Sequence, residues 1–120
     1  MLNNFCVNLT RSTDDPDRAT VAMVVANAAV ASGKQTMVFL SSEAVHLASK
    51  GIAEKINEEG FQPMSTLLQN FISAGGALWV CSPCFKKRGY TESNLIEGAT
   101  IVGGAKLVEF LSNDGTSVSY

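Results

Sequence analysis

Residues 78–89 constrain the fold most, because an apolar run typical of a buried strand ends there at a Cys-x-x-Cys motif. Ser82 is a good N-cap residue and Pro83 suits the first position of a helix, so a short helix should follow the strand directly. Cys81 is then expected at the carboxyl end of the strand and Cys84 in the first helical turn. In an open α/β sheet, this edge is where ligands bind.

Other apolar segments have the length and composition of strands, and they alternate with helical patterns along the chain. The strands are expected at residues 5–9, 36–40, 77–81, 99–102 and 117–120, with the last at a sheet edge. Helices are expected at residues 16–32, 44–50, 63–73, 83–88 and after 104, with a further turn beginning near residue 94. This alternation predicts an α/β fold, a mostly parallel sheet with helices on both faces. The length suits a single domain, residues 1–120.

Acidic residues precede the first helix and could be mistaken for a metal site. We interpret them as a helix start, because Asp15 can cap and Pro16 fits the first helical position. Apolar residues recur at helical spacing up to Gly33, namely Val21, Val24, Val25 and Ala28. The helix at residues 63–73 has a clearer stripe, which predicts a core or subunit-interface face: Met64, Leu67, Leu68, Phe71 and Ile72.

Composition argues against several classes of partner. The formal charge is -2, with 46% hydrophobic and 17% charged residues, and no basic stripe suggests binding to nucleic acid or to an anionic membrane. The longest apolar segment, residues 19–31, falls short of the roughly 20 residues that a membrane span needs. The first residues lack a signal-peptide pattern, so we expect a cytoplasmic protein.

Three cysteines do not make a secreted disulfide framework, and Cys-x-x-Cys in a reducing compartment indicates redox, sulfur or metal chemistry. Cys6 lies in a predicted strand and is interpreted as a small buried hydrophobe. Zinc would need four ligands, and only Cys6, His46 and scattered carboxylates could join the pair. A thioredoxin-type fold would need a proline after the motif, and none follows. Sulfur transfer needs only an accessible, stabilised thiolate and a docking surface, without metal or organic cofactor.

Lys86, Lys87 and Arg88 could lower the thiol pKa, complement the carboxyl end of the short helix while facing water, or bind an anionic partner surface. His46 is expected on the surface of its helix, although activation of a nucleophile by this residue stays possible. Gly103 and Gly104 favour a tight chain reversal over an anion site. Residues 41–43 follow a strand and should share the sheet edge with Cys81.

Several segments together resemble the DsrE/DsrF-like family, which includes sulfur-relay proteins. They are Trp79-Val80-Cys81-Ser82-Pro83-Cys84, Lys87-Arg88-Gly89, Asn94-Leu95-Ile96-Glu97-Gly98-Ala99 and Ile101-Val102-Gly103. The resemblance implies a small flavodoxin-like three-layer sandwich, assembled as a trimer or hexamer. It also implies that Cys81 carries persulfide sulfur between a protein donor and a protein acceptor.

Cys84 departs from family members that have a single cysteine, because it could attack a Cys81 persulfide, release sulfide and leave a disulfide. We therefore expect sulfur transfer with Cys81 as the acceptor and Cys84 as a resolving or modulating thiol, supported by Ser82, Lys86, Lys87 and Arg88. One alternative is a dithiol/disulfide, peroxiredoxin-like oxidoreductase that uses both thiols. Another is a non-catalytic oligomeric binding module. Residues 86–93 are expected to admit a partner.

Overall fold

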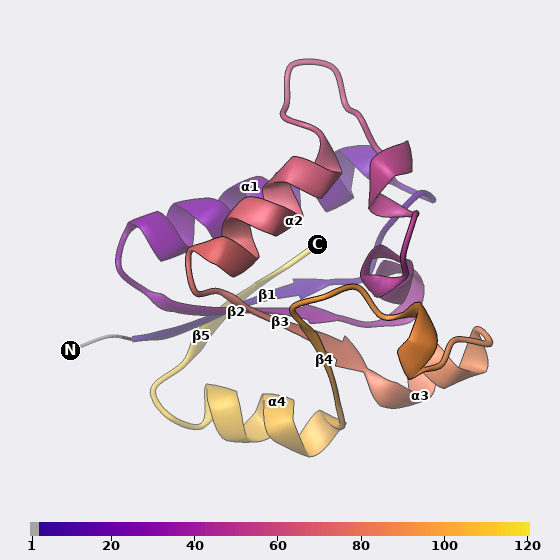
Figure 1. Cartoon of the computed structure of the whole chain (residues 1–120). Helices are drawn as coiled ribbons and strands as arrows, with labels where there is room; N and C mark the ends of the chain where they lie inside the picture. The colour runs from indigo at the N-terminus through magenta and orange to yellow at the C-terminus, as the bar shows by residue number, and fades with distance from the viewer. Residues whose placement is uncertain (1–2) are drawn as a thin grey trace.

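The computed structural model describes residues 3–120, which form a five-stranded sheet with the order β4-β3-β2-β1-β5 (Figure 1). Every neighbouring pair of strands is parallel. The strands are β1 (Asn4–Leu9), β2 (Gln35–Leu40), β3 (Ala77–Cys81), β4 (Ala99–Val102) and β5 (Thr116–Ser119). The five predicted strands are confirmed to within one residue at each end, and β5 lies at an edge of the sheet as expected.

Helices cover both faces of the sheet, which confirms the α/β three-layer sandwich. Helices α1 (Pro16–Ala31) and α2 (Met64–Ser73) lie together on one face, and α4 (Gly104–Leu111) lies on the other (Figure 1). The short α3 (Ser82–Lys87) follows β3 at the carboxyl edge. Three 3₁₀ turns complete the chain: η1 (Ser42–Ala48), η2 (Ala53–Lys55) and η3 (Glu92–Asn94). Within residues 3–120, no helix is both long and apolar enough to span a membrane.

The larger core lies between the sheet and the α1/α2 layer. The predicted stripe of α2 points into it, and Met64 and Phe71 are fully buried. The face under α4 is thinner, because Trp79 and Phe110 are only partly buried there and Val108 is 64% exposed. Burial on the α1/α2 side is therefore the main stabilising term, since apolar surface removed from water contributes roughly 25 cal/mol per Å².

The start of α1 is confirmed by a hydrogen bond from the Arg18 backbone N–H to the Asp15 carboxylate, at 3.1 Å. Its buried face is not the valine stripe, because Val24 is exposed. The buried residues are instead Ala19, Thr20, Ala22, Met23 and Ala26. The helix is apolar on most sides, so the pattern predicted a helix but not which face packs. Small alanines let the helix approach the sheet closely.

Two local predictions were wrong in their details. Residues 42–48 form the 3₁₀ turn η1, not an α-helix. The turn expected to begin near Asn94 instead ends there, because the capping box of Thr91 and Asn94 fixes the start of η3 at Glu92. Gly103 and Gly104 connect β4 directly to α4, as a tight reversal requires, although neither has a positive φ.

Candidate functional site

The junction of β3 and α3 holds the two cysteines of the Cys-x-x-Cys motif. Cys81, not Ser82, is the N-cap residue, with extended backbone angles of φ -65° and ψ 116°, so the helix begins one residue earlier than predicted. Pro83 is tolerated near the helix start because the first backbone N–H groups of a helix have no intrahelical partner. Cys84 lies in the first turn, as expected, and both thiols are free and partly exposed.

The two thiols interact, and their pKa values move in opposite directions. Burial opposes ionisation of Cys84, but the Ser42 backbone N–H, a hydrogen bond with Cys81, and the charges of Arg88 and Lys87 together lower its pKa. Burial raises the pKa of Cys81, and its hydrogen bond to Cys84 and the charge of Cys84 raise it further. The Cys84 backbone N–H and the Arg88 charge lower it only in part. The opposite directions of the two shifts therefore make Cys84 the more acidic thiol of the pair.

Ser42 reaches this site from the neighbouring strand. Strands β2 and β3 pair directly, so the residues that follow β2 lie beside the end of β3, as predicted for residues 41–43. Ser42 adopts a φ of 52°, in the left-handed region that non-glycine residues rarely occupy. Such strained backbone occurs often at functional sites. Here it accompanies a backbone N–H that stabilises the Cys84 thiolate.

Arg88 does not face water. The prediction that Lys86, Lys87 and Arg88 all face water is therefore wrong for Arg88. Its Nε and one terminal nitrogen donate to the same Glu43 carboxylate oxygen, at 3.0 and 2.8 Å, and the other terminal nitrogen donates to the Cys84 carbonyl at 3.1 Å. The Arg88 side chain is only 19% exposed. Lys86 and Lys87 are exposed, as that prediction stated. The guanidinium is thus held beside the thiol pair.

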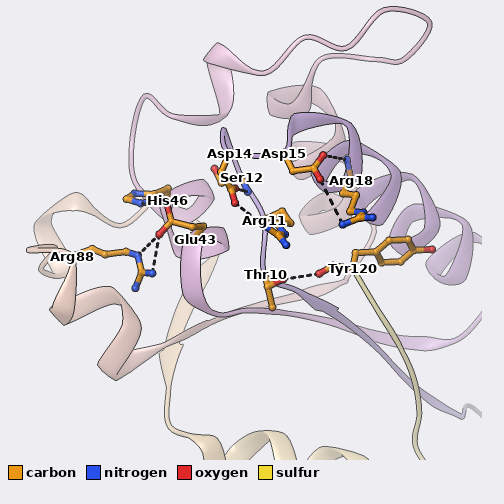
Figure 2. A network of polar contacts seen from close by, with 10 residues as sticks. All are labelled: Thr10, Arg11, Ser12, Asp14, Asp15, Arg18, Glu43, His46, Arg88 and Tyr120. Atoms are coloured by element: carbon orange, nitrogen blue, oxygen red, sulfur yellow. Dashed lines mark hydrogen bonds and ion pairs between the residues drawn. The ribbon is translucent and has the colours of Figure 1, made fainter.

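His46 is not the plain surface residue that its sequence position suggested. Its ring is 25% exposed, and its Nδ1 lies 2.7 Å from the hydroxyl of Tyr90, with the two rings edge to face. Its Nε2 lies 3.6 Å from the second carboxylate oxygen of Glu43. Figure 2 shows His46 and Arg88 on either side of Glu43. His46 makes no hydrogen bond to a cysteine among residues 3–120, so its ring does not activate the thiols directly.

Residues 3–118 match the family model described as the DsrE/DsrF-like family. The chain belongs to the DsrE/DsrF-like family. This match confirms the family resemblance that the sequence motifs indicated.

Two archaeal proteins and one solved structure are similar to this chain over most or all of its length. Uncharacterized protein MJ0989 from Methanocaldococcus jannaschii is 31% identical over 116 residues, which cover 97% of this chain and 98% of that protein. Protein MJ0760 from the same organism is 28% identical over 90% of this chain, but the match spans only 39% of its own length. The crystal structure of the ychN protein from E. coli superposes with a TM-score of 0.80 at 21% identity, covering both chains fully, and so confirms the fold.

A cavity of about 590 Å³ lies between α3, the segment that follows it and Ile101 of β4 in this DsrE/DsrF-like domain. Phe85 and Tyr90 form its apolar wall, with ring centroids 4.9 Å apart. Neither cysteine is among its lining residues, which are Ser82, Phe85, Lys86, Gly89, Tyr90, Thr91, Glu92 and Ile101. Within residues 86–93, Tyr90 packs on Phe85 and Thr91 caps the turn η3.

Cys6 stands apart from this site. It is fully buried in β1, and burial raises its pKa to about 11. Among residues 3–120, the only hydrogen-bond partner of its thiol is the Asn8 side-chain oxygen, at 3.6 Å. The same residues contain no group of three or more His, Cys, Asp or Glu side chains that could hold a metal ion. Cys6 is therefore the buried small hydrophobe that the sequence predicted.

Glu43 and Tyr90 are the members of the site that sequence reasoning did not select. Glu43 had one usable signal, its position just after a central strand at the same edge as Cys81. Nothing along the chain pairs it with Arg88, because 45 positions separate the two residues. Ser82, a predicted supporting residue, makes no side-chain capping hydrogen bond and instead lines the cavity.

Proposed function

We propose that this DsrE/DsrF-like protein is a cytoplasmic sulfur-relay protein that receives sulfane sulfur on Cys81 as a persulfide and passes it to a partner protein. The observation that carries the proposal is the interacting Cys81–Cys84 pair, partly exposed at the carboxyl edge of the sheet beside the Arg88 guanidinium. A thiolate attacks sulfur much faster than a thiol, so Cys81 needs a proton acceptor as it reacts, and Cys84, whose ionised form is favoured by cations and a backbone N–H group, can supply it.

The opposite pKa shifts of the two thiols support a division of labour. When Cys84, the more acidic thiol, is ionised, its thiolate accepts the proton of Cys81 while the Cys81 sulfur attacks the outer sulfur of a donor persulfide, R–S–SH. The S–S bond of the donor breaks and the donor leaves as RS⁻. The products are Cys81–S–SH, a neutral Cys84 thiol and RS⁻, so the single negative charge passes from Cys84 to the departing donor. Transfer to an acceptor thiolate repeats the exchange in the other direction.

The same pair also favours a second candidate, a dithiol oxidoreductase, because two free thiols at one strand–helix junction that influence each other's ionisation can form a disulfide. In that case the Cys84 thiolate attacks the inner sulfur of the Cys81 persulfide. A Cys81–Cys84 disulfide forms, and sulfide leaves as HS⁻. The proposal also includes protein partners and a homo-oligomer, both of which rest on family membership alone.

Mass spectrometry with peptide mapping tests the proposal, with glutathione persulfide as the sulfur donor. We expect one added sulfur on Cys81 in the wild-type protein and none after Cys81→Ser. Cys84→Ser should still accept sulfur, but more slowly by roughly 10- to 100-fold, because the proton acceptor is lost. Cys6→Ala serves as the control and should load normally, since Cys6 is buried away from the site.

The other outcomes separate the alternatives. Loss of two hydrogens, mapped to a Cys81–Cys84 disulfide and dependent on both residues, would replace the carrier proposal with the oxidoreductase. An unchanged mass in all variants would favour a binding module without thiol chemistry. Sulfur added at Cys84 and unaffected by Cys81→Ser would contradict the assignment of Cys81 as the carrier.

A further inference from the structure

Glu43 connects two elements that are far apart in the sequence. It belongs to η1, the turn after β2, and its carboxylate receives both hydrogen bonds that Arg88 donates from Nε and one terminal nitrogen. The remaining terminal nitrogen of Arg88 donates to the carbonyl of Cys84. The guanidinium is therefore fixed between the η1 carboxylate and the backbone of the residue that carries the more acidic thiol.

This arrangement matters because an arginine side chain is long and has many rotamers in the absence of a fixed partner. The Cys84 carbonyl alone supplies one hydrogen bond to Arg88, whereas Glu43 supplies a charged acceptor for two donors at short distance. Charge-assisted bonds of this kind are stronger than neutral ones. Without Glu43, Arg88 is free to extend into solvent, away from the sulfurs whose ionisation its charge favours.

We propose that Glu43 is a positioning residue that holds Arg88 against the thiol pair and, through Arg88, sets the reactivity of Cys84. Glu43 itself makes no hydrogen bond to either sulfur among the residues that the structure describes. Its role in sulfur transfer rests on the proposed function. The reactivity of the thiols can be measured without any sulfur donor.

Several ionisable groups surround this arrangement. Cys81 lies at the end of β3, and α3 contributes Lys86 and Lys87 besides Arg88. The other carboxylate oxygen of Glu43 faces His46 at 3.6 Å, and His46 is held by the Tyr90 hydroxyl. Each oxygen of Glu43 thus has its own partner, which fixes the plane of the carboxylate and with it the direction in which Arg88 is held.

Two opposite results are conceivable when Glu43 is replaced, and they separate positioning from a simple charge effect. If Glu43 acted only through its own negative charge, its removal would favour the Cys84 thiolate and lower the pKa of Cys84. If it acts by positioning, its removal releases Arg88, and the pKa of Cys84 rises.

The experiment is alkylation by iodoacetamide across a pH series, with peptide mapping to follow Cys84 separately. For Glu43→Ala we expect the pH midpoint of Cys84 alkylation to move upward, with a rate near neutral pH that is about 3- to 10-fold lower, since one pKa unit is tenfold in thiolate. Glu43→Gln keeps a hydrogen-bond acceptor without the charge and should restore part of the rate. Glu59→Ala is the matched control, because Glu59 is an exposed carboxylate in the loop between η2 and α2, and it should behave as wild type.

A double variant tests whether the effect passes through Arg88. Arg88→Gln should raise the midpoint by itself, and Glu43→Ala should then add nothing, since interacting residues are not additive. An unchanged or lowered midpoint in Glu43→Ala, or a full effect of Glu43→Ala in the Arg88→Gln background, would overturn the proposal. Thermal unfolding of each variant checks folding, and Arg88→Gln supplies the test if Glu43→Ala fails to fold.

The result is independent of sulfur transfer. A shifted midpoint in a protein that accepts no sulfur from glutathione persulfide would retain the positioning role and reject the proposed function. Normal sulfur loading with an unshifted midpoint would support the proposed function and reject the positioning role of Glu43.

Discussion

Cys6 and the Cys81–Cys84 pair show how the same side chain acquires different chemistry within one sheet. Cys6 lies within β1, which has β2 on one side and β5 on the other, and it is fully buried. Cys81 is the last residue of β3, and Cys84 follows it in α3. The buried thiol has a pKa raised to about 11, whereas the pKa of Cys84 is lowered. All three residues are cysteines, so their different pKa values come from where they lie in the sheet, within β1 or at the end of β3.

The physical difference lies in what surrounds each sulfur. Inside the sheet, the backbone N–H groups are used by the ladder, and burial penalises the charged thiolate. At the carboxyl edge the strands end, so the Ser42 backbone N–H and the Arg88 charge become available to Cys84. A buried site with no cation favours a neutral thiol, and an edge site with fixed donors favours a thiolate.

The largest expected effect concerns the stability that Cys6 contributes. Because its folded pKa lies above the ordinary value of 9.0, this contribution is complete below pH 9 and is lost as the pH rises toward 11. The loss is at most about 3 kcal/mol in the free energy of unfolding. The free energy of unfolding, measured with urea at each pH, should fall for wild type and not for Cys6→Ala, because the variant has no thiol at this position to ionise. The two plots against pH should therefore converge as the pH approaches 11.

Cys84 sharpens the comparison because its contribution has the opposite sign. Its lowered pKa stabilises the folded protein above the ordinary thiol pKa, and this contribution is lost as the pH falls through the folded value. Cys84→Ala should therefore alter the unfolding curve at lower pH than Cys6→Ala does. Parallel curves for wild type and Cys6→Ala would show that Cys6 is not the buried thiol described here.

A smaller effect is expected at Ser42, whose left-handed backbone supports the edge site. Ser42→Gly removes the steric cost of a φ of 52° and should raise the free energy of unfolding by about 1 kcal/mol or less. The N–H remains, so the alkylation of Cys84 should not change. Asp114→Gly is the matched control, with a φ of 58° far along the chain from the thiols. A slower Cys84 in Ser42→Gly alone would mean that the serine side chain also supports the site.

Sequence reasoning predicted the features of the fold that depend on local patterns. The apolar run at residues 36–40 was expected to be a strand, and the stripe that includes Met64 and Phe71 was expected to be a core or subunit-interface face, which in the structure is core. The position of Cys81 at a carboxyl edge also came from the sequence, since a strand followed by a helix start is a local signal. These features need only neighbouring residues to be recognised.

Other features depend on contacts that no local pattern encodes. The face of α1 was not predictable, because valines and alanines cover most of the helix and only packing selects among them. His46 was expected on the surface, but Tyr90, 44 positions later, covers it. The Arg88–Glu43 pair likewise joins separate elements, because 45 positions separate the two residues.

The most direct test of this comparison is pulsed alkylation of the native wild-type protein with iodoacetamide over a pH series, followed by peptide mapping of all three cysteines. We predict that Cys84 reacts first and with the lowest midpoint, that Cys81 follows, and that Cys6 is slower than an ordinary thiol by about 100-fold or more, because its pKa is about 11 against 9.0. Alkylation of Cys6 at the rate of Cys84, or a midpoint for Cys81 below that of Cys84, would contradict the account.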